Sequence, residues 1–230
     1  MTEPLKDLQT QIEYSFKDDA LLSMALTHSS VSVTLQDDIN YERLEFLGDR
    51  VLGLVMADLL YHKYPQESEG DLAKRHAALV QGKTLSKVAR DIDLGRVIIL
   101  SDNERASGGA DNDHTLADSM EALLGAIYID SGEDIKTCKT LIENLWGKLL
   151  DIMTEPPQDS KTALQEWVQA RNLPLPKYDI IERDGPDHAP EFTIQVVVEG
   201  YEAAEAKGPS RRSAEKKAAL RLLNYLENVD

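Results

Sequence analysis

The chain has 230 residues, with 25 Lys and Arg against 41 Asp and Glu, which gives a formal net charge of −16 at pH 7. This charge excludes a uniformly basic nucleic-acid coat protein, but it allows a basic patch on one face because local fields decide contacts. Hydrophobic residues make up 42% of the chain, enough for ordinary globular cores. The single cysteine, Cys138, excludes an internal disulfide and a zinc site built on paired cysteines.

The apolar stretches of the sequence are short. The richest, residues 51–57, is far too short to span a bilayer, and residues 1–16 mix charged with apolar side chains, unlike a signal peptide. No Walker loop or nucleophile elbow occurs. We therefore expect a cytoplasmic protein with no membrane partner and no small-molecule cofactor.

Two adjacent prolines, Pro156 and Pro157, indicate where the chain divides, because they end a helix and favour an extended linker. The predicted domains are residues 1–153 and 160–230, with a linker over 154–159. Residues 158–230 hold 10 Lys and Arg against 13 Asp and Glu, net −3, so the remaining 15 and 28 give the first part a net charge of −13.

Hydrophobic periodicity differs between the two parts. In the first, apolar residues recur at helical spacing up to about residue 151, which predicts an all-α domain. The second predicts an α-β-β-β-α order, with a helix, three strands and a helix over residues 160–171, 178–182, 192–198, 202–206 and 210–226. The predicted fold class is therefore α+β and multi-domain.

Three carboxylates lie close together on the helix predicted to begin near residue 41. At about 100° per residue, Glu42, Glu45 and Asp49 fall within an arc of about 60°. One interpretation is a solvated acidic face. However, residues 51–60 are apolar nearly all round, which predicts a buried helix, and clustered carboxylates beside a buried helix need a cation or a proton.

A second acidic pair, Asp118 and Glu121, lies at i, i+3 on another apolar helix. N-capping with Thr115 would explain Asp118 but not Glu121. Two such helices together would supply the hard oxygen ligands that suit Mg²⁺ or Mn²⁺, and Mg²⁺ held by carboxylates activates water against a phosphodiester. Spacing alone leaves the structural and the metal-binding interpretations open.

Residues 42–52, ERLEFLGDRVL, resemble the defining motif of bacterial ribonuclease III. Four other segments also match the family in the correct order, residues 25–29, 68–72, 106–109 and 116–128. The resemblance extends over essentially the whole chain. It implies a homodimeric, magnesium-dependent endonuclease for double-stranded RNA, with Mn²⁺ able to replace Mg²⁺.

The resemblance also implies roles for individual residues. Glu45, Asp49, Asp118 and Glu121 would bind the metal, and Asp49 and Glu121 would be tied most directly to hydrolysis.

Three further positions match family residues at the dimer interface. Glu42 and Glu69 match carboxylates near the catalytic valley there, and Phe46 matches an aromatic residue that inserts into the partner subunit. For Phe46, ordinary core packing is an alternative.

The sequence departs from the family pattern at two places. Arg50 stands where a small residue is usual, and the helical wheel predicts that it points away from the metal, about 100° from Asp49. The loop over residues 110–114 is acidic where relatives are often basic, which argues against phosphate contacts by this loop.

The second part is similar to a double-stranded-RNA-binding domain. Arg211, Arg212 and Lys216 lie at the start of its last helix, where the helix N-terminus adds positive potential suited to the phosphates of A-form RNA. Gln165 and Glu166 match minor-groove contacts to 2′-hydroxyls. His188 matches a contact to a neighbouring minor groove. A solvated basic patch that binds nothing is the alternative.

Together these features predict an enzyme that hydrolyses double-stranded RNA and leaves 5′-phosphate and 3′-hydroxyl ends. By resemblance, its substrates would be precursors of ribosomal RNA and structured messenger and transfer RNA precursors. Two other classes remain as rivals, a binding protein that has lost cleavage and an acidic helical scaffold that binds no RNA. All four metal ligands that the resemblance implies are present, which argues against the first rival.

Overall fold

The computed structural model describes residues 2–31, 41–186 and 189–229. By its internal contacts the chain divides into unit 1, Met1–Pro157, and unit 2, Gln158–Asp230. Each unit has its own hydrophobic core. In the described residues, no helix is both long enough and apolar enough to cross a membrane.

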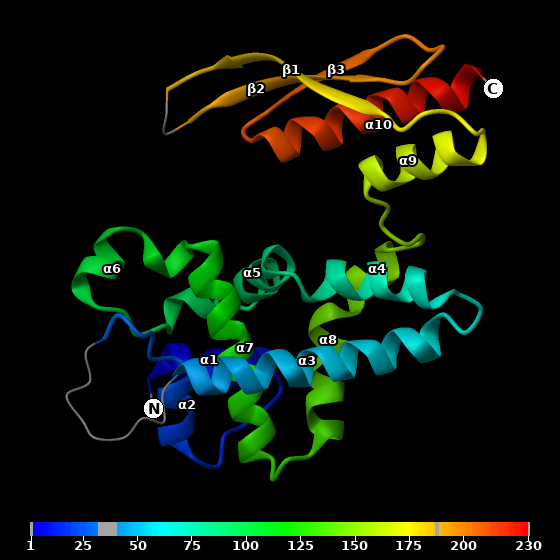
Figure 1. The fold of residues 1–230 in the computed structure, drawn as a ribbon. Coiled ribbons are helices and arrows are strands. Elements are labelled where there is room, and N and C mark those ends of the chain that lie inside the picture. The colour runs from blue at the N-terminus through cyan, green and yellow to red at the C-terminus, as the bar shows by residue number, and fades with distance from the viewer. Residues whose placement is uncertain (1, 32–40, 187–188, 230) are drawn as a thin grey trace. The chain divides into compact units, whose positions relative to one another are not determined.

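Unit 1 is built from helices (Figure 1). In chain order they are α1 (Glu3–Gln11), α2 (Asp19–Ala25), α3 (Tyr41–Lys63), α4 (Glu69–Val80), α5 (Gly82–Asp91), η1 (Leu94–Arg96), α6 (Asp102–Ala106), η2 (Gly109–Asp111), α7 (Asp113–Asp130) and α8 (Ile135–Ile152). The expectation of an all-α first domain is confirmed.

Side-chain caps account for where several of these helices begin. Ser68 accepts a hydrogen bond from the N–H of Asp71 at the start of α4, and Asn112 accepts from His114 and Thr115 at the start of α7. Such caps satisfy backbone donors that have no partner within the helix. They fix the first turns of α4 and α7. Helix α7 carries the predicted acidic pair, Asp118 and Glu121.

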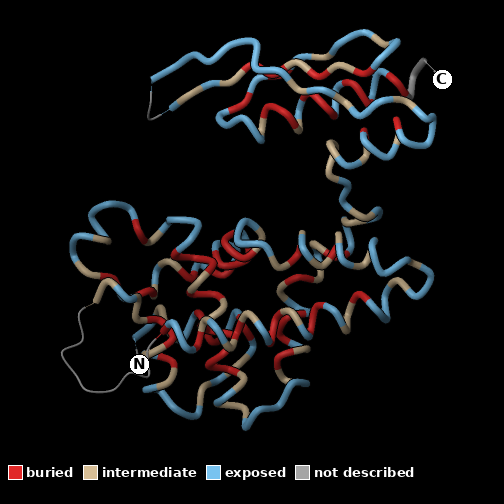
Figure 2. Tube along the Cα trace, in the orientation of Figure 1, coloured by how far each residue is buried: buried red, intermediate tan, exposed pale blue. Residues whose placement is uncertain are grey.

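Helices α3 and α7 lie at the centre of unit 1, and buried residues run along both (Figure 2). Leu52 and Met56 of α3 and Leu123 and Leu124 of α7 are all fully buried. The α8 side chain of Trp146 is buried as well, and its indole N–H donates to the Leu79 carbonyl of α4 over 3.0 Å.

One sequence expectation for α3 is wrong in part. The helix was predicted to be buried nearly all round over residues 51–60, yet Leu54 is 62% exposed, and Tyr61, just beyond that range, is 69% exposed. With Phe46, 65% exposed, these side chains form an apolar stripe that unit 1 leaves uncovered. Hydrophobic periodicity identifies the apolar face of a helix, but it does not show whether that face packs against the same chain or against another one.

Unit 2 combines α9 (Ser160–Ala170), β1 (Lys177–Asp184), β2 (Glu191–Val197), β3 (Ala204–Gly208) and α10 (Arg211–Val229). The strands form an antiparallel sheet in the order β1-β2-β3, with an irregularity between Ile180 and Glu182. Apolar side chains of α9, α10, β2 and β3 form its core. The predicted α-β-β-β-α order is confirmed.

Candidate metal centre and nucleic-acid interface

Helices α3 and α7 cross at unusually close range through two glycines. A Cβ atom added to Gly48 would lie 1.7 Å from the Glu121 carbonyl oxygen, and one added to Gly125 would lie 2.2 Å from that of Leu44. Real Cβ atoms do not approach oxygens so closely, so only glycine permits this crossing. The crossing places the acidic stretches of both helices side by side.

The two stretches meet in an acidic cluster, which we define as Glu45, Asp118 and Glu121. One carboxylate oxygen from each side chain lies within 4.8 Å of the others, and all three are partly buried. The structure thus brings together three of the four predicted metal ligands from two helices that are far apart in sequence, since α3 ends at Lys63 and α7 begins at Asp113.

Crowding and burial change the acidity of this cluster. Burial, followed by the charges of Glu45 and Asp118, raises the pKa of Glu121 to about 7, although Arg50 opposes the shift. Burial also raises the pKa values of Glu45 and Asp118, and the neighbouring carboxylates of Asp118 and Glu42 raise that of Glu45 further. Three carboxylates that resist ionisation together form a site that a divalent cation would stabilise.

The fourth predicted ligand, Asp49, lies outside this cluster. Its carboxylate accepts a hydrogen bond from the guanidinium of Arg50, the next residue along α3. The expectation that Arg50 points away from the site is therefore wrong. The helical wheel gives the direction of the Cα–Cβ bond, but a long arginine side chain reaches back across it.

Tyr41 is a residue of this region that the sequence analysis missed. It is buried at the first position of α3, and its hydroxyl lies 3.2 Å from the Ser119 hydroxyl of α7. Burial, and then the charge of Asp118, raises the pKa of Tyr41 well above its ordinary value, against the effect of the Ser119 contact. Its place four residues before Glu45 was the available signal.

The acidic loop that departs from the family pattern has a structural partner. Arg90 of α5 donates to the Asp111 carboxylate over 2.8 Å and to the Asp111 carbonyl over 2.7 Å, and it pairs with Asp113 at 2.8 Å. These contacts hold the loop next to the first turn of α7. The acidic residues thus position the helix that carries Asp118 and Glu121.

The predicted interface residues lie on the surface of unit 1. Glu42 is exposed close to Glu45, and Glu69 is exposed at the first position of α4, outside the acidic cluster. Core packing of Phe46 is ruled out by its 65% exposure, and the Arg50 guanidinium lies 5.2 Å from the centre of its ring.

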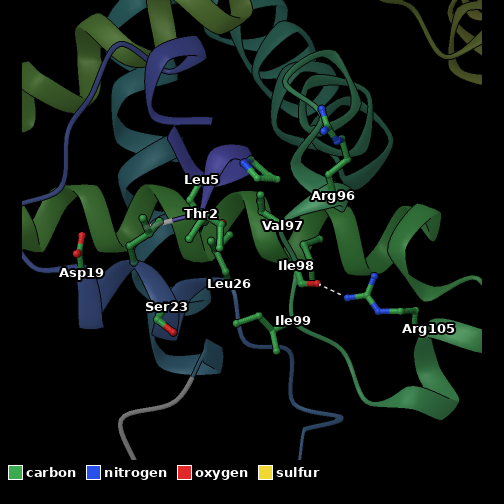
Figure 3. Close-up of a pocket in the computed structure, with 12 residues that line it drawn as sticks. Thr2, Leu5, Asp19, Ser23, Leu26, Arg96, Val97, Ile98, Ile99 and Arg105 are labelled. Carbon is green, nitrogen blue, oxygen red and sulfur yellow. Dashed lines mark hydrogen bonds between the residues drawn. The ribbon is translucent and has the colours of Figure 1, made fainter. Parts of the chain in front are cut away.

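Unit 1 also contains a cavity of about 500 Å³ between α1, α2 and residues 96–99 (Figure 3). Its walls are largely apolar, from residues such as Leu22, Leu26 and Ile98, with Arg96 and Arg105 nearby. None of the predicted metal ligands lines it, so this cavity is not the candidate site.

In unit 2, several predicted RNA contacts line one concavity of about 450 Å³. Gln165 of α9 and Arg212 and Lys216 of α10 all face it. Arg211 is exposed at the start of α10 and Glu166 is exposed on α9. The remaining predicted contact, His188, lies outside the described residues.

Comparisons with known proteins match both units. Residues 18–148 fit a family described as ribonuclease-III-like, and residues 160–226 fit the double-stranded RNA binding motif. A Wolbachia pipientis protein named ribonuclease 3 is 47% identical over 220 residues, 95% of each chain. Ribonuclease 3 of Rhodobacter capsulatus is 46% identical over 223 residues, 97% of this chain and 96% of its own.

A solved structure shows the same fold for unit 1. The nuclease domain of ribonuclease III from Campylobacter jejuni, described with a flexible region involved in dimer formation, matches with a TM-score of 0.58 and 41% identity. The match covers 63% of this chain and 96% of that domain.

Proposed function

The chain belongs to the ribonuclease III family and is an endoribonuclease that acts on double-stranded RNA, and we propose that it cuts with Mg²⁺ held by Glu45, Asp49, Asp118 and Glu121. The observation that carries this proposal is the acidic cluster, whose three carboxylates lie within 4.8 Å of one another and lack charge balance. Hard oxygen donors of this kind fit Mg²⁺, with Mn²⁺ able to replace it.

When bound, the metal would supply an activated water and would stabilise the leaving oxygen of the phosphodiester, giving 5′-phosphate and 3′-hydroxyl ends. Glu121 and Asp49 are the residues that we assign most directly to hydrolysis. Glu121 has the strongest raised pKa of the cluster and lies at the crossing of the two helices, where its backbone is fixed against Gly48.

To join the other ligands, the Asp49 carboxylate would have to break its ion pair with Arg50. Its carboxylate is 37% exposed and lies next to Glu45 by one helical turn, so a rotamer change brings it toward the cluster without moving the backbone. Arg50 thus acts as a counter-ion to Asp49 in the absence of metal, and it competes with the metal for this ligand.

We also propose that two copies of the chain pair through α3. Phe46, Leu54 and Tyr61 fall within an arc of about 80° of this helix, and all three are more than 60% exposed. Exposed apolar side chains that share one helix face are typical of a protein interface, and the charged side chain of Arg50 lies on this face as well. Glu42, next to Glu45, and Glu69 of α4 would then lie beside the same interface.

RNA would be held by unit 2 through Gln165, Glu166, Arg211, Arg212 and Lys216, and we keep His188 as a proposed contact. The cations and the N-terminus of α10 favour phosphates, whereas Gln165 and Glu166 suit ribose hydroxyls, which distinguish RNA from DNA. Such contacts recognise the shape of an A-form helix rather than its sequence. Precursors of ribosomal RNA and structured messenger and transfer RNA precursors are the substrates that we propose.

A labelled RNA duplex, incubated with the full chain with and without Mg²⁺ and resolved on denaturing and native gels, tests the proposal. Cutting that requires Mg²⁺ and leaves 5′-phosphate ends supports it. Retention on the native gel without cutting would indicate a binding protein that has lost catalysis. If the duplex is neither retained nor cut, the acidic helical scaffold that binds no RNA is the remaining interpretation.

A further inference from the structure

The cations of the proposed RNA-binding face are accompanied by two carboxylates, Asp159, which lines the concavity, and Glu215, which contacts Lys161 and Arg211. Asp159, which caps α9, faces the same concavity as Lys161, Arg212 and Lys216. Glu215 of α10 lies one residue before Lys216, and its side chain is only 10% exposed. A face that is expected to bind a polyanion thus contains two built-in anions.

Each carboxylate is in direct contact with a cation of this face. The Lys216 ammonium lies 2.6 Å from an Asp159 carboxylate oxygen. Glu215 accepts hydrogen bonds from two sides, from the Lys161 ammonium over 2.6 Å and from Arg211 Nε over 2.8 Å. Two of the proposed phosphate ligands, Arg211 and Lys216, therefore already have an anionic partner in the free protein.

Both carboxylates keep their charge at neutral pH. Burial alone would raise the pKa values of Asp159 and Glu215, but the contacts with Lys216, and with Lys161 and Arg211, outweigh it, so that both pKa values are lowered. A carboxylate accepts the same charge-assisted hydrogen bonds as a phosphate oxygen. Phosphates of RNA therefore compete with these carboxylates for the donors of the same cations.

Tyr178 supplies a partner for a displaced carboxylate. Tyr178 lines this concavity, and its hydroxyl is buried and has no hydrogen-bond partner among the described residues. It lies close enough to Glu215 and Asp159 for their charges to add to the effect of burial and raise the pKa of Tyr178 to about 12. A hydroxyl that keeps its proton can donate it to an anion that has lost its lysine.

We propose that Asp159 and Glu215 are internal competitors of the RNA phosphates, which hold Lys216, Lys161 and Arg211 in place in the free protein and are exchanged for phosphates on binding. The proposal rests on the assignment of Arg211 and Lys216 as RNA contacts. The competition would limit affinity for any one duplex, because each phosphate contact replaces an ion pair instead of forming on an unpaired cation.

The variant Asp159→Asn removes the charge and keeps the side-chain acceptor that caps α9. Binding of a blunt RNA duplex to the full chain is measured in EDTA over a series of salt concentrations. We expect the Kd to fall about two- to fivefold at 0.1 M salt, and the slope of log Kd against log salt to become steeper by up to about one. Glu215→Gln should act in the same direction.

Asp179→Asn is the matched control. Asp179 is exposed on β1 and follows Tyr178, so its side chain lies on the opposite face of the strand. It carries the same change in net charge, and we expect a smaller effect on Kd. An equal gain in affinity from Asp179→Asn would show that only total charge matters and would overturn the proposal.

A double-mutant cycle tests the exchange itself. In a Lys216→Ala background, Asp159→Asn should no longer improve binding, since no cation remains to be released. Unchanged or weaker binding by Asp159→Asn in the native background, or the same gain with and without Lys216, overturns the proposal. If Lys216→Ala alone binds RNA as tightly as the native chain, Lys216 is not an RNA contact, and the proposed function of this residue is overturned separately from the competition. Thermal unfolding of each variant checks that unit 2 remains folded. If Glu215→Gln unfolds, the binding measurements on Asp159→Asn alone test the proposal.

Discussion

Between α3 and α7, three carboxylates lie within 4.8 Å of one another and the pKa of Glu121 is raised to about 7. At the proposed RNA-binding face of unit 2, the carboxylates of Asp159 and Glu215 instead lie 2.6–2.8 Å from a cation, and their pKa values are lowered. The same side-chain type is thus destabilised as an anion in one unit and stabilised as an anion in the other.

This difference indicates what each region needs from its ligand. The acidic cluster is electrostatically incomplete, and a divalent cation removes the repulsion that the fold enforces. The RNA-binding concavity is already balanced in part, so its ligand must exchange with existing partners. An acidic protein can therefore bind a polyanion because its charges are distributed locally and not because of its total charge.

The largest expected effect comes from removing one charge of the acidic cluster. Glu121→Gln keeps the size of the side chain but removes a proposed ligand, and we expect the rate of duplex cutting to fall by about 100- to 10,000-fold. Duplex affinity in EDTA should be unchanged because unit 2 is untouched. Glu143→Gln, an exposed change on α8, is the control. Normal cutting by Glu121→Gln would remove this residue from the active site.

The helix crossing that creates the cluster can be broken without touching a charge. In Gly48→Ala, the added Cβ would meet the Glu121 carbonyl oxygen at 1.7 Å, so the helices must separate. We expect the free energy of unfolding to fall by about 1–3 kcal/mol and cutting to slow by up to about 100-fold, because the carboxylates lose their register. Denaturant unfolding and a cutting assay measure both effects.

Gly53→Ala is the matched control on the same helix. There the added Cβ meets only the His76 ring nitrogen, at 3.9 Å. Alanine stabilises a helix relative to glycine by roughly 0.5–1 kcal/mol, so this variant should be slightly more stable and fully active. Equal loss of activity in both variants would show that the close crossing is not the cause.

The sequence could predict the helices of unit 1 and the order of unit 2, because period and turn residues are local signals. Its resemblance to ribonuclease III also implied that Glu45 and Asp118 belong to one site, whereas their spacing on apolar helices left a structural interpretation open. It could not predict that Gly48 and Gly125 face each other, because the distance between two helices depends on contacts between residues far apart in the chain.

Direction and pairing of long side chains were the weakest part of the prediction. The helical wheel misplaced Arg50, whose guanidinium lies on Asp49, and periodicity interpreted Leu54 as core when it is 62% exposed. The ion pairs of Asp159 and Glu215 also could not be predicted, since they join α9 to α10 across the unit. Such contacts depend on tertiary structure, which local pattern does not contain.

A smaller effect should appear in the pH dependence of stability without metal. Glu121 has an ordinary pKa of 4.5 and a pKa of about 7 in the fold. Between these values the folded state keeps a proton that the unfolded state has lost, so stability falls as pH rises from 4.5 to about 7. We expect Glu121 to make the melting temperature of unit 1 roughly 2–4 °C lower at pH 7.5 than at pH 5. This shift is smaller than the pKa difference alone implies, because Glu121 is only partly buried and solvent screens its charge.

Calorimetry of the native chain and of Glu121→Gln at both pH values checks this expectation. The variant should lose most of the dependence, and addition of Mg²⁺ should remove it in the native chain, because the metal replaces the proton. The same decline in both proteins would show that the repulsion within the cluster does not control stability.

The smallest expected effect concerns Arg50, whose guanidinium lies on the proposed metal ligand Asp49. The Arg50 side chain is 66% exposed, and exposed ion pairs contribute only about 0.2–1 kcal/mol. Arg50→Gln should therefore lower the Mg²⁺ concentration for half-maximal thermal stabilisation by about two- to fivefold, whereas Arg50→Lys should stay near the native value. This variant makes unit 1 less like unit 2, because it removes the positive charge that pairs with Asp49. A midpoint that is unchanged or higher in Arg50→Gln would show that Arg50 does not compete with the metal, and that Asp49 reaches its ligand position without an exchange of the kind proposed for Asp159.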